Sequence, residues 1–420
     1  MASTINPELT KRLEGVKDAS LLLQKASATT RDSALGAIAQ ALRTSAPEIV
    51  AANALDIERG VSEGMSGSLQ DRMRLTLERV EGLADAVDQI RALPDPVGDV
   101  VRGMTLPNGL RITQVRVPFG VIGAIYEARP NVTVDISALA LKSGNAVVLR
   151  GGSAALSSNE VLVQIMQEAL RSAGLPAEII STVDDYGREG ASALMHARGL
   201  IDVLVPRGSA SLIDTVVTTS SVPVIETGSG VVHIFVDGTA DLHAAIEIVH
   251  NSKVQRPSVC NALETLLVHK AVAKDFVPAV AKRLTESGVV LHGCPIALES
   301  VPTMAAATEE DWEREYLSLD LAVKVVESLD EALDHIRRYS TSHTESILTQ
   351  NMANAERFLQ EVDSAVVMVN ASTRFTDGGE FGFGAEVGIS TQKLHARGPM
   401  GLPELTSTKW IVRGSGQTRA

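Results

Sequence analysis

The sequence predicts an α/β protein with two domains, each built on a parallel sheet, and a small β-hairpin arm. From residue 119 onward, short apolar runs alternate with segments of helical periodicity, a pattern typical of parallel strands covered on both faces. The 420 residues exceed the usual size of one hydrophobic core, so two domains are expected. Within residues 101–117, Pro107, Asn108 and Gly109 form a strong turn signal between two extended runs, which predicts the hairpin.

The composition restricts the class of function. The formal net charge is −13, so a nucleic-acid backbone would be repelled. Two cysteines cannot build a disulfide framework, which suits a reducing cytosol. The first residues contain no apolar signal core, and no apolar run approaches the length of a transmembrane helix. We therefore expect a cytoplasmic protein that binds neither nucleic acid nor a membrane. The nine histidines show no spacing that predicts a metal site.

The first hundred residues are helical in pattern. Apolar residues from Leu35 to Leu42 repeat at helical spacing and predict a helix with one buried face. A second helix is expected over residues 70–93, where it is ended by Pro94.

The βα alternation that follows predicts the first parallel sheet. Its strands are expected at residues 119–126, 146–149, 178–183, 200–205, 222–225 and 231–236. Helices are expected at residues 132–142, 156–173, 188–196 and 209–219. Ligands of such sheets bind beyond the carboxyl ends of the strands.

A second alternation begins after Asp237 and predicts a second sheet. Helix 242–250 is followed by irregular chain over 251–258 and by a buried strand over 262–269. Further expected elements are helices 272–286, 329–339 and 352–361, and strands 322–326, 346–348 and 365–369. Apart from this domain, residues 409–412 are expected to form a final strand.

Cys260 is the first candidate for chemistry. It follows the polar, cationic residues Lys253 and Arg256, whose positive charge is expected to favour the thiolate. The alternative is that Cys260 is a small buried hydrophobe, as most thiols are. Cys294 lies in a short, isolated segment and is expected to be inert.

A glycine turn after strand 146–149 is the candidate cofactor site. There is no Walker motif and no G-x-G-x-x-G, but Arg150, Gly151, Gly152 and Ser153 lie between a strand and a helix. Glycines allow close approach of a ligand, and the start of a helix favours an anion. An arginine at this strand end suits the 2′-phosphate of NADP rather than the ribose of NAD. A plain glycine turn remains the alternative.

Polar side chains at other strand ends are candidates for substrate binding. A small substrate that carries a carboxylate or phosphate would suit these cationic and amide groups, although each alone is more often a structural cap or a surface charge. The candidates are Arg129, Arg256, Asn370, Ser372, Arg374, His395 and Arg397. Glu226 ends a buried strand against glycines, where a carboxylate serves as a general base or as a cap.

Taken in order, these segments resemble the aldehyde dehydrogenase superfamily over nearly the whole chain. The ordered set is residues 117–123, 142–149 and 224–228, then Cys260 and Glu315. Three segments are similar to one branch of that superfamily, which reduces L-glutamyl 5-phosphate. They are residues 126–133, 255–261 and 395–407.

The resemblance implies the activity. The expected reaction is the NADPH-dependent reduction of L-glutamyl 5-phosphate to L-glutamate 5-semialdehyde through a cysteine thioester, with phosphate release, as in proline biosynthesis. Functional coupling to glutamate 5-kinase is a further expectation.

The resemblance also implies residue roles. Cys260 lies where the family has its nucleophile, Glu226 where oxidative members keep a base, and Glu315 where they hold the nicotinamide ribose. Asn131 is the nearest candidate for the amide that holds the oxyanion. Arg150 replaces the family's lysine at the ribose. The other implied cofactor contacts are Pro206, Arg207, Gly208 and Ser209.

The resemblance further implies the domain organisation. Residues 1–99 and 117–230 would form the NADP-binding domain, and 231–397 the catalytic domain. Residues 100–116 and 398–420 would form an arm and terminal strand that assemble a homo-oligomer, since an isolated hairpin is marginally stable.

Two rival functions remain open. A non-phosphorylating aldehyde dehydrogenase that oxidises a small acidic aldehyde would hydrolyse its thioester and need Glu226 as a base. A thiol acyltransferase would use Cys260 without a nicotinamide.

Overall fold

The computed structural model describes residues 6–127 and 129–419. The chain forms two compact units. The first unit comprises Met1–Glu226, Gly382–Gly388 and Met400–Ala420, and the second comprises Thr227–Phe381 and Ile389–Pro399.

The first unit contains a parallel sheet with the strand order β5-β4-β3-β6. The strands are β3 (Val121–Tyr126), β4 (Ala146–Arg150), β5 (Ile180–Thr182) and β6 (Val203–Arg207). Their apolar residues are buried on both faces, as the continuous apolar runs predict. In the register of the sheet, Ile125 pairs with Arg150 and Tyr126 with Arg207. Two arginines therefore end the strands on either side of β3 at one edge.

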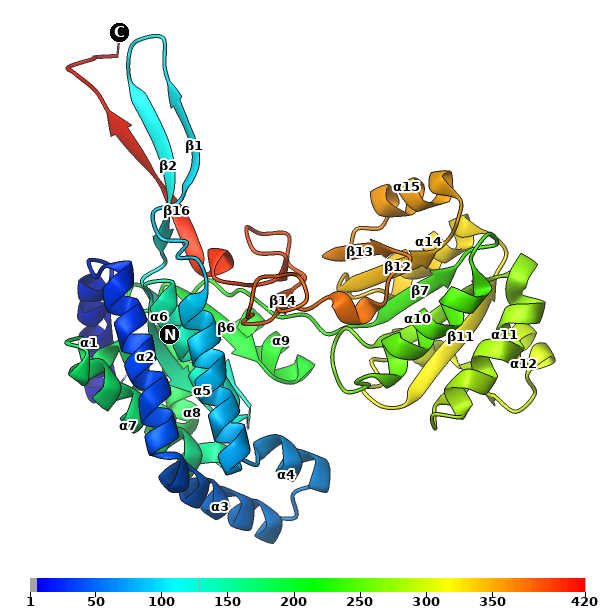
Figure 1. Ribbon diagram of the computed structural model, residues 1–420, viewed down its shortest axis with the longest axis horizontal. Helices are drawn as coiled ribbons and strands as arrows, with labels where there is room; N and C mark the ends of the chain where they lie inside the picture. The colour runs from blue at the N-terminus through cyan, green and yellow to red at the C-terminus, as the bar shows by residue number, and fades with distance from the viewer. Residues whose placement is uncertain (1–5, 128, 420) are drawn as a thin grey trace. The chain divides into compact units, whose positions relative to one another are not determined.

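Helices cover this sheet (Figure 1). The helices of the first unit are α1 (Pro7–Leu23), α2 (Ala28–Thr44), α3 (Ala46–Ser62), α4 (Gly67–Met73), α5 (Leu77–Ala92), α6 (Pro130–Lys142), α7 (Leu156–Ser172), α8 (Gly187–His196) and α9 (Ala210–Thr219). Apolar residues of α1, α8 and α9 share one core cluster with β3, β4 and β6. Helices α2 and α5 pack against each other and against α6.

The helix predicted over residues 70–93 is wrong in one respect, because the chain breaks it into α4 and α5. The side chain of Thr76 accepts a hydrogen bond from the N–H of Arg79 and begins α5 there. Asn53 of α3 fixes the break: its Nδ2 donates to the carbonyl of Met73 and its Oδ1 accepts from the N–H of Leu75. These side chains replace the helical bonds that the break removes.

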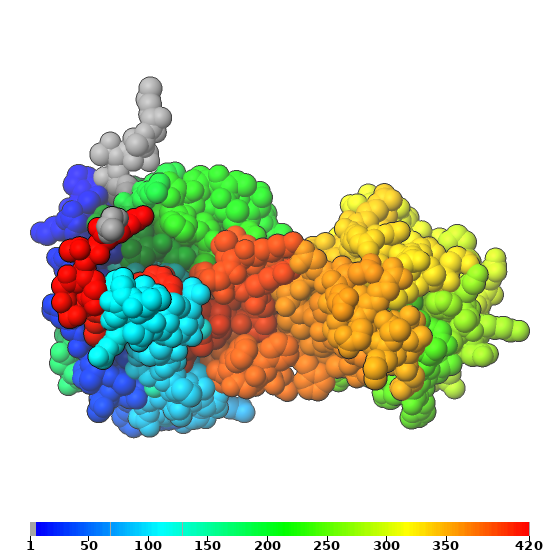
Figure 2. Space-filling model, turned by 90° about the horizontal axis from the view of Figure 1, so that it is seen from above, coloured from blue at the N-terminus to red at the C-terminus, as the bar shows by residue number. Residues whose placement is uncertain are grey.

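The predicted hairpin is present. Strands β1 (Val100–Thr105) and β2 (Arg111–Pro118) are antiparallel, and Gly109 in the turn has a φ of +85°. Strand β16 (Thr406–Arg413) pairs with β2 and completes a sheet with the order β1-β2-β16. Figure 2 shows the hairpin, in cyan, beside the C-terminal strand, in red.

The second unit contains a parallel sheet with the order β10-β9-β11-β8-β7-β12-β13. The strands are β7 (Val232–Val236), β8 (Leu263–His269), β9 (Val290–Gly293), β10 (Ala305–Ala306), β11 (Asp320–Val326), β12 (Thr344–Leu348) and β13 (Val366–Val369). The helices are α10 (Leu242–Val254), α11 (Lys270–Thr285), α12 (Pro295–Ser300), α13 (Glu309–Glu313), α14 (Leu329–Tyr339) and α15 (Met352–Glu361).

The two faces of this sheet bury separate clusters. On β7, Ile234 and Val236 pack with α10 and α11, whereas Phe235 packs with α14 and α15. The helices lie on opposite sides of the sheet in Figure 1. Alternation of side chains along a strand accounts for this division.

Three expectations for strands and loops need correction. Residues 231–236 do not complete the first sheet, since β7 pairs with β8 and β12 in the second. Residues 222–225 contribute only a single bridge, from Val224 to Leu204. Helix α10 extends to Val254, so Lys253 is helical rather than part of irregular chain.

Among the described residues, no helix has the length and apolar character needed to cross a bilayer. The same residues contain no cluster of three or more His, Cys, Asp or Glu side chains that would hold a metal ion.

Candidate active site

The predicted cofactor turn lies at the carboxyl edge of the first sheet. Arg150 is the last residue of β4, and its guanidinium donates to the carbonyls of Gly151 (2.9 Å) and Gly187 (3.3 Å). Gly152 is half-buried and Ser153 is exposed. The turn therefore presents these residues and a nearby positive charge at the edge where ligands of parallel sheets bind.

Gly151 is required by its surroundings. A β-carbon at this position would overlap the amide of Asn159, and the N–H of Gly151 donates to Oδ1 of Asp184 at 2.7 Å. Asn159 Nδ2 donates to the other oxygen of Asp184, and its Oδ1 accepts from Thr133. Burial raises the pKa of Asp184, while the hydrogen bonds from Gly151 and Asn159 oppose that shift.

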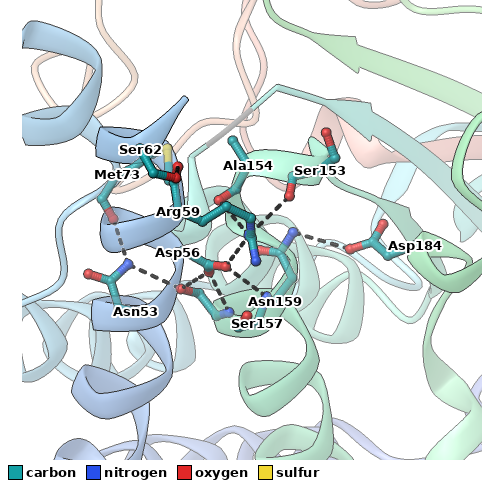
Figure 3. Close-up of polar contacts among 11 residues, drawn as sticks. Asn53, Asp56, Arg59, Ser62, Met73, Ser153, Ala154, Ser157, Asn159 and Asp184 are labelled. Carbon is teal, nitrogen blue, oxygen red and sulfur yellow. Dashed lines mark hydrogen bonds and ion pairs between the residues drawn. The ribbon is translucent and has the colours of Figure 1, made fainter. Parts of the chain in front are cut away.

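The start of α7 is already occupied by a side chain. Asp56 of α3 is buried and accepts hydrogen bonds from the backbone N–H groups of Ser157 (3.1 Å) and Ser158 (2.8 Å) (Figure 3). Arg59 pairs with Asp56 and donates to the carbonyls of Ser153 and Ala154. The expected anion site at this helix N-terminus is therefore filled by a carboxylate of the chain itself.

The second predicted cofactor segment ends β6 and begins α9. Pro206 and Arg207 belong to the strand, and Ser209 caps the helix by accepting from Leu212. Ser209 also donates its hydroxyl (2.6 Å) and its backbone N–H (3.1 Å) to Glu127 at the end of β3. A β-carbon on residue 208 would overlap the Glu127 side chain, which would have to shift.

Asn131, the candidate for the oxyanion amide, lies in the first turn of α6. Its Nδ2 donates to Oδ2 of Asp135 at 3.2 Å. Burial raises the pKa of Asp135 to about 6, whereas Asn131 and the charge of Arg207 lower it. Arg129 is exposed at the start of the same helix, and Glu226 is half-buried where the first unit ends.

In the second unit, Cys260 lies between α10 and β8, and its side chain is half-buried. The backbone of Gly230 packs directly on the Cys260 carbonyl, where a β-carbon on residue 230 would overlap that oxygen. The N–H of Gly230 donates to Glu315 at 2.8 Å. Burial raises the pKa of Glu315, and the Gly230 hydrogen bond opposes this. Glu315 is thus joined through Gly230 to the loop between α10 and β8 that carries Cys260, the thiol loop.

Asn261 connects the thiol loop to Arg374. Its side chain accepts from Nη1 of Arg374 and donates to the carbonyl of Thr376 at 2.8 Å. Nε of Arg374 donates to Gln255 at 2.6 Å. Burial lowers the pKa of the Arg374 guanidinium, as does the charge of Arg256, whereas Asp377, Cys260 and Glu380 raise it. A cation is therefore held close to the candidate nucleophile.

Lys253 has a different role from the one expected. Its Nζ donates to Oε2 of Glu264 at 2.6 Å, and both side chains are 0% exposed. Burial lowers the pKa of Lys253 and raises the pKa of Glu264. Glu264 also accepts the N–H of Leu317. The ammonium of Lys253 is thus paired with Glu264, at the base of the thiol loop.

The remaining substrate candidates have structural contacts. Ser372 is buried, and its hydroxyl donates to the side chain of Asn251 at 2.7 Å. The side-chain amide of Asn370 accepts from the N–H of Thr349 and donates to the carbonyl of Thr349. Arg397 pairs with Asp363 at 2.8 Å. Arg256 and His395 are exposed. Substrate binding by these residues stays a prediction.

Of the predicted residues, the structure brings Cys260, Glu315 and Arg374 together through Gly230 and Asn261 in the second unit. In the first unit it brings Arg150 and Arg207 to one edge. Sequence reasoning missed Asp56 and Asp184. Asp184 had a usable signal, because it directly follows the strand predicted over residues 178–183. Cys294 lies in the hydrophobic core and its Sγ accepts the N–H of Val325. Its inertness stays a prediction.

The family model described as aldehyde dehydrogenase family matches residues 7–295. The chain therefore belongs to the aldehyde dehydrogenase family. The predicted α/β fold class is confirmed by the crystal structure of a gamma-glutamyl phosphate reductase from Thermotoga maritima, which is 46% identical to this chain. The two structures superpose with a TM-score of 0.97, over 98% of this chain and 100% of the other.

Curated relatives agree over the full length. A gamma-glutamyl phosphate reductase of Leifsonia xyli subsp. xyli is 63% identical, with 98% of each chain covered. That of Thermobifida fusca is 58% identical, with 99% of each chain covered. Within the aldehyde dehydrogenase family, the chain groups with these reductases.

Proposed function

We propose that this chain reduces L-glutamyl 5-phosphate to L-glutamate 5-semialdehyde and releases phosphate, with NADPH as the reductant. The observation that carries the proposal is the full-length similarity to gamma-glutamyl phosphate reductases. The thiol of Cys260, which the sequence resemblance predicts to be the nucleophile, supports it. Family membership implies a nicotinamide cofactor. The preference for NADP is our inference from Arg150.

The carboxyl edge of the first sheet fits a phosphate-bearing dinucleotide. Arg150 and Arg207 end the two strands that flank β3, and Gly151 keeps the turn free of a side chain. These residues, with Gly152 and Ser153, would hold the cofactor's phosphate groups. When bound, NADPH supplies the hydride.

Cys260 carries out the covalent step. Its thiolate attacks the acyl carbon, a C–S bond forms, and the C–O bond to phosphate breaks, so phosphate leaves and a thioester remains. After reduction, the thiohemiacetal collapses, the C–S bond breaks and the thiolate re-forms as the aldehyde departs. The Gly230 backbone holds the Cys260 loop in place during these steps. Asn131 would donate to the oxyanion, with its amide oriented by Asp135.

Because no water needs activation in this reaction, a positioning role for Glu226 stands beside the role of a base. The cytoplasmic location, functional coupling to a glutamate 5-kinase and oligomerisation through the β1-β2-β16 arm belong to the same proposal. Exposed apolar residues on these strands support assembly. They are Val100, Val101, Met104, Trp410 and Val412.

The test is a coupled assay that contains glutamate 5-kinase, ATP, glutamate and either NADPH or NADH. We expect Cys260→Ala to abolish turnover and to retain NADPH binding, whereas Cys294→Ala, the matched control, keeps turnover. In the reverse direction, oxidation of the semialdehyde should require phosphate. Oxidation without phosphate would favour the hydrolytic aldehyde dehydrogenase instead.

A further inference from the structure

A small cavity lies beside the thiol loop in the second unit. Its volume is about 210 Å³, below the roughly 300–1,000 Å³ of clefts that take drug-sized ligands. Six residues line it: Asn251, Gln255, Arg374, Phe375, Asp377 and Glu380. Asn261, which follows Cys260 in sequence, is bonded to Arg374 and Thr376 in the segment that lines this cavity. The cavity therefore borders the loop of the nucleophile.

The charges of the lining are mixed. Arg374 supplies a guanidinium, which Gln255 and Asn261 hold in place. Asp377 and Glu380 supply carboxylates, whose charges raise the pKa of the Arg374 guanidinium across the cavity lining. Oδ1 of Asp377 accepts the N–H groups of Gly379 and Glu380, which fixes the loop.

This lining distinguishes between the possible ligands. A phosphate dianion would pair with Arg374 but would be repelled by both carboxylates. A ligand with only an ammonium would be repelled by Arg374. A group that carries a carboxylate and an ammonium on one carbon satisfies both signs, because each charge meets its opposite across a short distance.

We propose that this cavity binds the α-amino acid end of the substrate. The α-carboxylate pairs with Arg374, and the α-ammonium pairs with Asp377 and Glu380. The proposal rests on the proposed function, in which the substrate is a glutamyl group whose other end reacts with Cys260. It adds an ammonium-recognition role for Asp377 and Glu380 and directs phosphate to another part of the site.

The first experiment measures binding without turnover. Calorimetry compares L-glutamate with glutarate, which lacks the ammonium, on the full-length protein. We expect tighter binding of L-glutamate, and a loss of that preference by roughly tenfold or more in the double variant Asp377→Asn with Glu380→Gln. Asparagine keeps the acceptor that fixes the loop. Glu356→Gln on the exposed face of α15 is the matched control and should retain the preference.

The second experiment measures specificity. In the presence of phosphate and NADP, kcat/KM for glutamate 5-semialdehyde is compared with that for 5-oxopentanoate, which lacks the α-amino group. The ratio should fall roughly tenfold in the same double variant. Arg374→Gln should lower kcat/KM for both carboxylate-bearing aldehydes and leave the KM for phosphate in place.

The outcomes separate the two proposals. If wild-type protein oxidises no semialdehyde but still prefers L-glutamate over glutarate, the proposed function fails and the amino-acid site stands. If turnover is normal but the double variant keeps its preference in both experiments, the site is elsewhere. A raised KM for phosphate in Arg374→Gln would assign this cavity to the phosphate and overturn the proposal.

Discussion

Gly230 packs on the Cys260 carbonyl so closely that residue 230 has no space for a β-carbon. The same glycine donates its N–H to Glu315. A glycine thus connects the candidate nucleophile to Glu315, the predicted contact of the nicotinamide ribose, and it does so through its backbone alone.

Gly230→Ala should displace the thiol loop. Because a shift of about 1 Å at a reacting group can cost roughly 100-fold in rate, we expect kcat to fall by about that factor. The measurement is steady-state kinetics together with the rate of Cys260 alkylation by iodoacetamide. Gly82→Ala in α5, where the new methyl group meets open space, should keep both values. Unchanged kcat in Gly230→Ala would show that the loop relaxes without consequence.

Lys253→Met should leave the Glu264 carboxylate buried without its cation. Removal of one partner of a buried pair costs roughly 3–5 kcal/mol, so the free energy of unfolding should fall by about that amount in urea titrations. The double variant Lys253→Met with Glu264→Leu should recover much of the loss, since it leaves no buried charge. Lys270→Met, which breaks an exposed pair with Glu327, should cost only about 0–1 kcal/mol.

Asp135 should make the folded protein less stable as pH rises. Its folded pKa is about 6, above its ordinary value of 3.8, so between these values the folded state retains a proton that the unfolded state has lost. The free energy of unfolding should therefore decrease through this window and level off above pH 6. Asp135→Asn should reduce the decrease by up to about 3 kcal/mol. Thermal unfolding at several pH values measures this, with the exposed Asp214→Asn as control. An identical pH profile in Asp135→Asn would contradict the assignment.

Arg150→Ala should weaken the preference for NADPH. We expect the KM for NADPH to rise roughly tenfold and the KM for NADH to change less, because a charge-assisted contact to the 2′-phosphate is lost. Arg171→Ala, in the last turn of α7, removes the same charge as Arg150→Ala and is the control. It should leave the KM values for NADPH and NADH unchanged. Equal effects on the KM values of the two cofactors would show that Arg150 only stabilises the turn, through its hydrogen bonds to Gly151 and Gly187.

Local patterns in the sequence predicted the sheets, because a parallel strand buried on both faces must be a continuous apolar run. The rule that ligands bind beyond strand ends selected Arg150, Asn131 and Arg374. Cys260 could be selected because it follows a polar loop and precedes a buried strand.

Contacts between distant segments could not be predicted in this way. Asp56 caps a helix that begins about a hundred residues later, and nothing in the local sequence of α7 requires an aspartate on α3. The sequence predicted Lys253 to be a cation of the loop. Its partner Glu264 lies in a strand of otherwise mostly apolar residues, so the pattern gave no sign of a buried ion pair. Asn53 breaks a helix from outside that helix. Each of these depends on tertiary structure, which periodicity does not encode.

The pairing of β16 with β2 has a consequence for biosynthesis. Arg116 and Thr406 are 290 positions apart, so at roughly 5–20 residues per second a ribosome needs about 15–60 s between them. During that time the outer edge of β2 has no β16 beside it, and all seven strands of the large sheet in the second unit are made before β16. The second sheet can therefore assemble before the β1-β2-β16 sheet is complete. Until β16 is made, the unpaired backbone groups of β2 can bind a strand of another nascent chain.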